Sequence, residues 1–393
     1  MSVFDWNPVR TETDSMKWDV KPGELPMWVA DMDFATCPAV QEAIEKRAAH
    51  GIYGYTLVPD SWYEAYRSWW QTRHNFPIQK DWLMFCTGVV PAISSMVRKL
   101  TYPAENVVVL SPVYNIFYNS IYNNGRNILE SPLAYADGLY RIDWTDLEAK
   151  LADPQTSLLI FCNPHNPCGR IWTREELVKV ADLCGKYGVT VISDEIHCDL
   201  TRPGKGYIPF ASVSETAARI SASCLSPSKA FNLAGLHTAA ICVPDPFLRH
   251  KVWRGINTDE IAEPEVFACL AAETAYTQGA GWLDELNTYI YGNREIAETF
   301  IDEQISPLKV VKADATYLVW IDCSALTDNT DELQAFLREK TGLYLSEGSE
   351  YGTGGASFLR LNAACSHERL EEGLQRLKDG IALWQSEHTS KNK

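Results

Sequence analysis

The sequence predicts an α/β fold, with a large domain built on a mostly parallel central sheet flanked by helices and a smaller α+β domain. Short apolar runs rich in β-branched residues recur through the middle of the chain, as in strands buried on both faces of a sheet. A helical pattern lies between two of these runs, which is the strand, helix, strand unit of a parallel sheet. At 393 residues, the chain is long enough for one large domain and a second, smaller one.

The strands of the large domain are expected at four apolar runs. These runs cover residues 106–110 (NVVVL), 157–162 (SLLIFC), 189–193 (VTVIS) and 238–243 (TAAICV). Between the second and third runs, residues 173–187 place apolar side chains at i, i+3, i+4 and i+7, and Thr173 with Glu176 offers a capping box. This segment is therefore predicted to be the helix that connects two neighbouring parallel strands.

Further helical patterns cover residues 38–49, 264–276, 282–300 and 366–377. From about residue 283 onward the pattern changes to a long helix, isolated strands at 317–321 and 358–362, and a final helix, which is typical of an α+β unit. We therefore expect an N-terminal segment, residues 1–45, that joins the small domain. Residues 46–282 are predicted to form the large domain, and residues 283–393 the small C-terminal domain.

The charge of the chain argues against two classes of partner. It has 35 Lys plus Arg against 51 Asp plus Glu, a formal net charge of -16, so its field would repel phosphate backbones and anionic lipid. We expect no nucleic acid and no membrane partner. Residues 1–20 carry charge without an apolar signal segment, and the eleven scattered cysteines are typical of reduced thiols. These features predict a cytoplasmic protein.

A lysine in the segment Ser226-Pro227-Ser228-Lys229 is the strongest candidate for covalent chemistry. Its amine can form a Schiff base with an aldehyde while the neighbouring hydroxyls bind a phosphate. Since the pattern Ser-x-Ser-Lys also occurs on ordinary surface loops, the interpretation depends on the segments that accompany it.

Two further segments each lie at the end of an expected strand. Residues 163–170 (NPHNPCGR) follow the SLLIFC run, and their two Asn-Pro pairs and glycine favour an irregular loop. Residues 193–197 (SDEIH) end the next run, which puts Asp194 at the carboxyl end of that strand. Ligands of open α/β sheets bind at this edge, so both segments are expected to face the same crevice.

These three segments, in this order and spacing, resemble those of the fold-type I pyridoxal-phosphate enzymes related to aspartate aminotransferase. Within that superfamily, five segments resemble the carbon-sulfur β-lyases of the MalY and PatB type. The segments are residues 28–34 (WVADMDF), 50–55 (HGIYGY), 88–94 (GVVPAIS), 163–170 and 193–200 (SDEIHCDL). The resemblance runs from about residue 17 to about residue 364.

The resemblance implies that Lys229 holds pyridoxal 5′-phosphate as a Schiff base and that Asp194 pairs with its pyridine nitrogen. A carboxylate about 4 Å from a pyridinium contributes on the order of 4 kcal/mol at an effective dielectric near 20, which keeps the ring protonated. Asn166 would hydrogen-bond the phenolic oxygen of the cofactor, and Tyr114 would stack on its ring. His197 stands where aminotransferases usually have tyrosine, as in the β-lyase group, and is expected beside the cofactor.

The phosphate of the cofactor is expected at the start of the helix that follows residue 88. The residues implied there are Gly88, Val89 and Val90, through their backbone N–H groups, with Ser226 and Ser228. Tyr55 matches the tyrosine that reaches the phosphate of the neighbouring subunit, which implies a homodimer with shared active sites. Two positions depart from the family pattern. His237 stands where many members keep a phosphate-binding arginine, and Ala230 stands where these lyases commonly have threonine.

Arg360 matches the arginine that binds the substrate's α-carboxylate, a fork-to-fork pairing that lysine could not reproduce. The implied reaction is β-elimination from a small sulfur amino acid. Lys229 would remove the Cα proton, a thiolate would leave from Cβ, and pyruvate and ammonia would follow. Cystathionine is the leading candidate among cysteine S-conjugates, and the physiological one is left open.

Two other functions remain open on the sequence alone. An aminotransferase shares every step up to loss of the Cα proton and then returns a proton to the cofactor. A regulatory protein that binds a transcription activator is the second alternative, because the resemblance to the lyase group includes a member of that kind. A metal site is not expected, since His165, Cys168, His197 and Cys198 lack the paired spacing of metal ligands.

Overall fold

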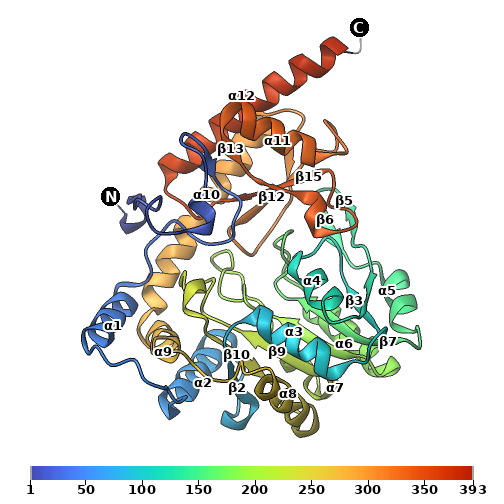
Figure 1. Cartoon of the computed structure of the whole chain (residues 1–393). Coiled ribbons are helices and arrows are strands. Elements are labelled where there is room, and N and C mark those ends of the chain that lie inside the picture. Colours follow the sequence, from blue (N-terminus) through green and yellow to red (C-terminus); the bar gives the residue numbers. More distant parts are fainter. Residues whose placement is uncertain (1, 392–393) are drawn as a thin grey trace.

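The computed structural model of the chain describes residues 2–391, and its larger part is a seven-stranded sheet with helices on both faces (Figure 1). The strands lie in the order β2 (Leu83–Cys86), β10 (Ala239–Cys242), β9 (Ser221–Leu225), β8 (Thr190–Asp194), β7 (Thr156–Cys162), β3 (Asn106–Val109) and β4 (Asn127–Glu130). Strand β10 runs antiparallel to its two neighbours, and the other pairs are parallel. The expected α/β fold with a mostly parallel central sheet is confirmed.

Both faces of this sheet are apolar, because successive side chains of a strand point to opposite sides. Val108 and Leu159 point to the first face, whereas Val107 and Ile160 point to the second. Three helices cover the first face: α5 (Trp144–Leu151), α6 (Arg174–Tyr187) and α7 (Glu215–Ile220). Three others cover the second: α3 (Val89–Leu100), α4 (Ile116–Tyr122) and α8 (Pro246–Thr258). The uninterrupted apolar runs of the sequence therefore reflect burial on two sides.

The predicted connecting helix is α6, and its two ends form as the sequence predicts. The hydroxyl of Thr173 accepts a hydrogen bond from the backbone N–H of Glu176, whose carboxylate accepts one from the N–H of Thr173. At the other end, Gly188 takes a left-handed conformation with φ of 73°, which glycine adopts at little cost. The capping box is therefore confirmed.

A second sheet of four antiparallel strands forms the smaller part of the molecule. Its order is β11 (Lys309–Val310), β12 (Leu318–Asp322), β15 (Phe358–Asn362) and β14 (Ser346–Glu347). Helices α11 (Thr330–Thr341) and α12 (His367–Lys391) pack on it, and their leucines share one apolar core with Val319 and Leu361. The two isolated strands expected in this region are β12 and β15.

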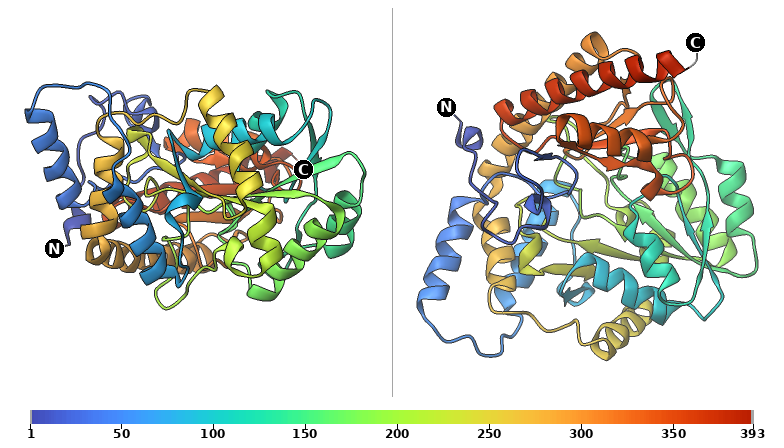
Figure 2. Two further views of the ribbon diagram at one scale, coloured as in Figure 1. Left: turned by 90° about the horizontal axis from the view of Figure 1, so that it is seen from below. Right: turned by 45° about the horizontal axis from the view of Figure 1, so that its top comes forward.

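Helix α10 (Ala280–Gln304) connects the two parts of the molecule (Figures 1 and 2). Leu283 near its start lies in a core of the larger part, whereas Ile301 near its end lies in the core beside the smaller sheet. The N-terminal segment reaches the smaller part as well, because β1 (Leu25–Pro26) pairs in parallel with β13 (Leu343–Tyr344). These contacts agree with a two-domain organisation, and the boundaries at residues 45 and 282 stay predictions.

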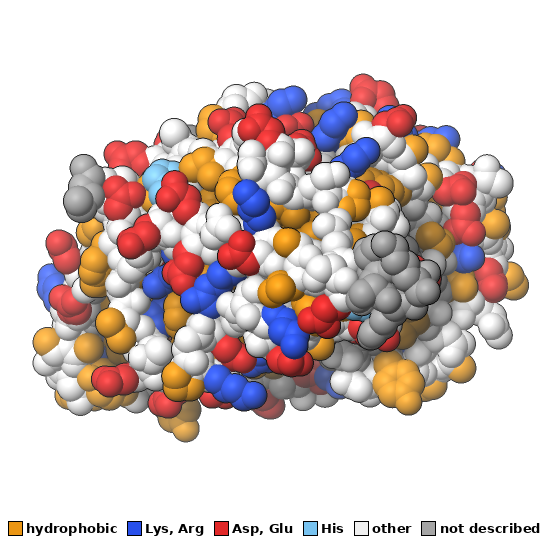
Figure 3. All heavy atoms as spheres, turned by 90° about the horizontal axis from the view of Figure 1, so that it is seen from above, with side chains coloured by type: hydrophobic (Ala, Val, Ile, Leu, Met, Phe, Trp, Pro, Cys, Tyr) orange, Lys and Arg blue, Asp and Glu red, His pale blue; other side chains and the backbone are white. Residues whose placement is uncertain are grey.

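Three further α-helices and one hairpin belong to the described residues, and two of these helices contribute many buried side chains to an apolar core. These elements are α1 (Pro38–Ala49), α2 (Asp60–His74), α9 (Ala268–Gln278), and the hairpin of β5 (Ala134–Ala136) and β6 (Leu139–Arg141). Acidic and basic side chains are interspersed on the face seen from above (Figure 3). No helix within residues 2–391 combines the length and the apolar character that crossing a membrane requires. All eleven cysteines lie buried as free thiols.

Candidate active site

The candidate site lies at one edge of the seven-stranded sheet. Gly88 follows β2, Asn166 follows β7, Asp194 ends β8 and Lys229 follows β9. Because the carboxyl ends of parallel strands share an edge, four separate loops meet there. A cavity of about 250 Å³ opens at this edge.

Nine of the twelve predicted site residues line this cavity. They are Gly88, Val89, Val90, Tyr114, Asn166, Asp194, His197, Ser228 and Lys229. Arg360 lies next to them, because its Nη1 is 3.4 Å from the Oδ1 of Asn166. Ser226 lies behind the wall: its hydroxyl donates to the backbone oxygen of Thr238 (2.7 Å) and contacts the hydroxyl of Ser228 (2.8 Å).

Tyr55 is separated from the cavity of its own chain. Its side chain is fully exposed and lies beside a surface hollow between residues 55–58 and residues 262–264. A role for Tyr55 at an active site therefore requires the site of another subunit, as the sequence analysis expects.

Lys229 is held at the cavity by a backbone carbonyl. Its Nζ donates a hydrogen bond of 2.6 Å to the oxygen of Ala30. Burial, with the positive charge of Arg360, lowers the pKa of the Lys229 amine to about 8. An amine with this pKa gives up its proton far more easily than an exposed lysine, as a general base requires.

Asp194 is buried, and few interactions within the protein stabilise its negative charge. Its carboxylate accepts a hydrogen bond of 3.1 Å from the backbone N–H of Ile196. Burial, together with the charge of Glu195, raises the pKa of Asp194 to about 7. A cationic group placed in the cavity would stabilise the ionised carboxylate, as a protonated pyridine nitrogen does.

Glu195, the next residue, has the opposite environment. Its carboxylate accepts hydrogen bonds from Ser193, Ser223, Tyr207 and the backbone N–H of Phe210. Since neighbouring side chains of a strand end point to opposite sides, one acid faces the cavity while the other is bound within the protein. Glu195 is therefore a structural residue.

The aromatic wall of the cavity is electrically neutral. Burial, with the charges of Lys229 and Arg360, lowers the pKa of His197 to about 3. Burial also raises the pKa of Tyr114 to about 12. A neutral imidazole and a neutral phenol can both contact a planar ring and donate hydrogen bonds to it.

One end of the cavity has the features of a phosphate site. Helix α3 begins after Gly88, so its free N–H groups and positive dipole end face the cavity. The hydroxyl oxygen of Thr238 is buried without a hydrogen-bond partner among the described residues, and Thr238 lines the same cavity. The hydroxyl of Ser228 and the ring of His237 are also at this cavity. These donors fit the phosphate of pyridoxal 5′-phosphate.

Several cavity residues were missed by the sequence analysis. They are Ala30, Thr87, Pro91, Ile196, Ala234 and Thr238. Thr238 could have been found, because it begins a predicted strand whose start lies at the same sheet edge. Ala30 contributes a backbone oxygen, and a backbone contact leaves no signal in the residue type.

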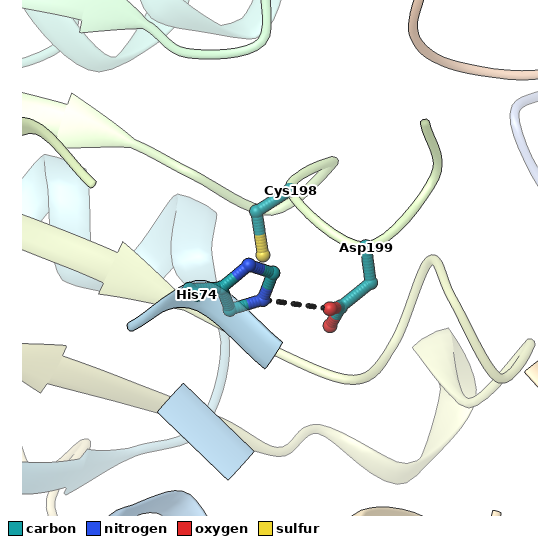
Figure 4. A group of neighbouring side chains, drawn as sticks. All are labelled: His74, Cys198 and Asp199. Atoms are coloured by element: carbon teal, nitrogen blue, oxygen red, sulfur yellow. Dashed lines mark hydrogen bonds and ion pairs between the residues drawn. The ribbon is translucent and has the colours of Figure 1, made fainter. Parts of the chain in front are cut away.

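A group of three potential metal ligands lies elsewhere, at the end of α2 (Figure 4). His74 Nε2 lies 2.9 Å from Asp199 Oδ1, and the Trp69 indole N–H donates to the same carboxylate. Burial raises the pKa of the adjacent Cys198 thiol well above its usual range, which disfavours the thiolate that a metal needs. We interpret this group as a buried hydrogen-bonded cluster, and the expectation of no metal stays a prediction.

Comparisons with known proteins agree with this geometry. The family model for aminotransferase class I and II matches residues 25–377. Cystathionine beta-lyase PatB of Bacillus subtilis (strain 168) is 45% identical, over 96% of this chain and 100% of PatB. Protein MalY of Escherichia coli (strain K12) is 34% identical, over 96% and 99%. The structure of cystalysin from Treponema denticola, which contains pyridoxal 5′-phosphate, has a TM-score of 0.93 at 32% identity, over 96% and 98%.

Proposed function

The chain belongs to the aminotransferase class I and II family, and we propose that it is a pyridoxal-phosphate-dependent carbon-sulfur β-lyase. It cleaves cystathionine or a related cysteine S-conjugate into a thiol, pyruvate and ammonia. The observation that carries this proposal is that Lys229 and Asp194 line the same cavity. The pKa of the Lys229 amine is lowered there to about 8. The names of PatB and cystalysin point to the same reaction class.

Pyridoxal 5′-phosphate is the cofactor, and the cavity residues fit it. When bound, it supplies an aldehyde that joins to amino groups and a ring that accepts electrons from Cα. The buried hydroxyl of Thr238 and the start of α3 suit the phosphate. Asp194, whose pKa is raised to about 7, gains from a cationic ring nitrogen. Asn166 and Tyr114 would contact the ring's oxygen and face.

Lys229 is proposed to move the protons of the reaction. A pKa of about 8 leaves roughly a tenth of the amines uncharged at pH 7, against fewer than about one in a thousand at the usual lysine pKa. The uncharged amine takes the proton from the substrate's Cα. The thiolate then leaves from Cβ, and the same lysine is positioned to protonate it.

Arg360 is proposed to bind the substrate's α-carboxylate. It lies on β15 of the smaller sheet, buried, and its Nε has no hydrogen-bond partner among residues 2–391. Asn166 lies 3.4 Å from its Nη1, so the guanidinium sits at the edge of the cavity with a donor still free. A planar carboxylate can accept two parallel hydrogen bonds from such a fork.

We also propose a homodimer in which Tyr55 reaches the partner's cofactor phosphate. The segment around Tyr55 exposes Ile52, Tyr53 and Leu57, with 66%, 58% and 75% of their surface accessible. Apolar side chains clustered in this way gain stability when a second subunit covers them. The unpaired buried thiols further favour the reducing cytoplasm.

The reaction separates the lyase from an aminotransferase, which belongs to the same family. Purified protein loaded with pyridoxal 5′-phosphate is incubated with cystathionine, with and without an added keto acid. The lyase releases pyruvate and thiol in equal amounts, and the keto acid changes neither. Turnover that depends on the keto acid would instead identify a transaminase.

A further inference from the structure

The loop of residues 28–34 contacts both residues on which the proposed reaction depends. The backbone oxygen of Trp28 accepts a hydrogen bond of 2.9 Å from Arg360, and that of Ala30 accepts one of 2.6 Å from Lys229. Tyr317 also donates to the oxygen of Ala30 (2.9 Å). The loop therefore helps to set the distance between the substrate-binding arginine and the proton-moving lysine.

This loop has no regular secondary structure, so side chains must hold its shape. Asn362, two residues after Arg360, donates to the backbone oxygens of Val29 and Asp31, both at 2.6 Å. Asn232, three residues after Lys229, donates to the oxygen of Met32 (3.0 Å) and accepts from its N–H (3.1 Å). The loop is thus tied to the catalytic segments on both sides.

The far end of the loop is fixed by a cluster of buried charges around Asp33. The Asp33 side chain is 2% exposed and accepts hydrogen bonds from Lys17 Nζ (3.0 Å), Arg10 Nη1 (2.9 Å) and Trp18 Nε1 (3.1 Å). Arg369 of α12 lies 2.9 Å from the other carboxylate oxygen. Three cations from two distant parts of the chain therefore surround one carboxylate.

Arg10 binds more of the loop than this one carboxylate. Its guanidinium also donates to the backbone oxygen of Met32 (3.0 Å) and to the carboxylate of Asp31 (2.6 Å). Lys17 in turn lies 3.3 Å from the backbone oxygen of Asp31. Any loop conformation that separates these partners leaves a buried charge unpaired, which is strongly destabilising, so the cluster disfavours other conformations of the loop at the active site.

We propose that Asp33 is a positioning residue for the lyase reaction. Held by Arg10 and Lys17, it anchors the 28–34 loop so that the carbonyls of Trp28 and Ala30 stay beside Arg360 and Lys229. The N-terminal charge cluster then helps to position the catalytic groups, although Arg10, Lys17 and Asp33 do not line the cavity. The inference rests on the proposed lyase function.

The kinetic test compares two arginines that both bind the N-terminal segment. Arg10→Gln removes the contacts to Asp31, Met32 and Asp33, whereas the control Arg376→Gln removes hydrogen bonds to the backbone oxygens of Gly23 and Thr341. We expect Arg10→Gln to lower kcat/KM for cystathionine at least tenfold, through a raised KM and a lowered kcat. Arg376→Gln should stay within twofold of wild type, and Arg10→Lys should recover part of the loss.

The proposal is overturned if folded Arg10→Gln keeps kcat and KM within twofold of wild type. Lys17→Met, which leaves Arg10 and Arg369 beside Asp33, takes its place if Arg10→Gln does not fold. For Lys17→Met too, a loss of kcat/KM of at least tenfold supports the proposal, and kcat and KM within twofold of wild type overturn it.

A second readout does not need the reaction. Hydrogen–deuterium exchange of the amides of residues 28–34 is measured in cofactor-free protein. Faster exchange in Arg10→Gln than in wild type and Arg376→Gln supports the anchoring, and unchanged exchange contradicts it. If wild type releases no pyruvate, the proposed function fails, whereas the exchange result still decides whether Asp33 anchors the loop.

Discussion

Two buried aspartates show how differently one side chain is used in two regions of this molecule. Asp33, in the N-terminal charge cluster, is 2% exposed, and Asp194, in the cofactor cavity, is 3% exposed. Burial alone would raise the pKa of Asp33, but the charges of Lys17 and Arg369 outweigh it and lower that pKa. Burial raises the pKa of Asp194 to about 7. Cationic side chains of the protein stabilise the buried negative charge of Asp33, whereas the buried carboxylate of Asp194 has no such partner among the described residues and would be stabilised by a cationic ligand.

The largest expected loss of activity comes from a substitution in the cavity that contains Asp194. Lys229→Ala removes the proposed attachment point of the cofactor and the proposed base, so we expect pyruvate release to fall by about 10³-fold or more. Steady-state assays with cystathionine measure the loss. The melting temperature of the cofactor-free variant should match that of wild type, since Lys229 has no ion pair within residues 2–391. Substantial pyruvate release by this variant would assign the chemistry to another residue.

Asp194→Asn comes next, because it removes the charge that is proposed to pair with the cofactor's ring nitrogen. At about 4 kcal/mol for this interaction, kcat should fall roughly 10²- to 10³-fold. The unfolding free energy of the cofactor-free protein at pH 7 should not fall, because the carboxylate has little compensation there. Urea titration of the stripped variant measures this, and a loss of several kcal/mol would refute the contrast with Asp33.

Asp33→Asn should lower the unfolding free energy, in addition to the loss of kcat/KM expected from its positioning role. It leaves Lys17 and two arginines around a neutral amide, and breaking a buried ion pair costs about 3–5 kcal/mol. Asp31→Asn is the matched control, because the Asp31 side chain is 22% exposed and its carboxylate binds only Arg10 among residues 2–391, so a smaller loss than for Asp33→Asn is expected. Equal urea midpoints for the two variants would show that the cluster around Asp33 does not stabilise the fold.

The last expected effect is a difference in pH dependence, which is gradual in any one pH unit. The folded pKa of Asp194, about 7, lies above the unfolded value of about 3.9. Between these values the folded protein binds the extra proton, so cofactor-free wild type loses stability relative to Asp194→Asn as pH rises, by up to about 1.4 kcal/mol per pH unit. The contribution of Asp33, whose pKa is lowered, has the opposite sign and is lost as pH falls below about 4. Parallel stability curves for wild type and Asp194→Asn from pH 4 to 7 would refute the raised pKa.

Much of the larger sheet could be predicted, because its central strands carry a signal of their own. Strands β7 and β8 appear in the sequence as uninterrupted apolar runs. Strand β9 has the sequence SASCL, and its small and hydroxyl side chains give no such run. It forms a strand because β8 and β10 pair with it on both sides. Its own residue types do not favour a strand.

The site residues also divide into those that could be predicted from the sequence pattern and those that could not. Asn166, Asp194 and Lys229 could be predicted as neighbours, since each lies at or after the end of a strand and such ends share one sheet edge. Arg360 was found through the resemblance to known lyases, because it reaches the cavity from the second sheet. The role of Tyr55 stays a prediction, since its side chain is exposed and does not line the cavity of its own chain.

The sequence by itself predicted the α/β class from its apolar runs and helical patterns, and the resemblance of its motifs to a known family predicted the cofactor and Lys229 as its site of attachment. The tertiary structure alone decided how the loop of residues 28–34 is held. Arg10, Asp33 and Arg369 are far apart in the chain, and each is an ordinary charged residue in its local sequence. They act as one unit only where folding removes water from between them, because an ion pair gains its strength and its geometry from burial.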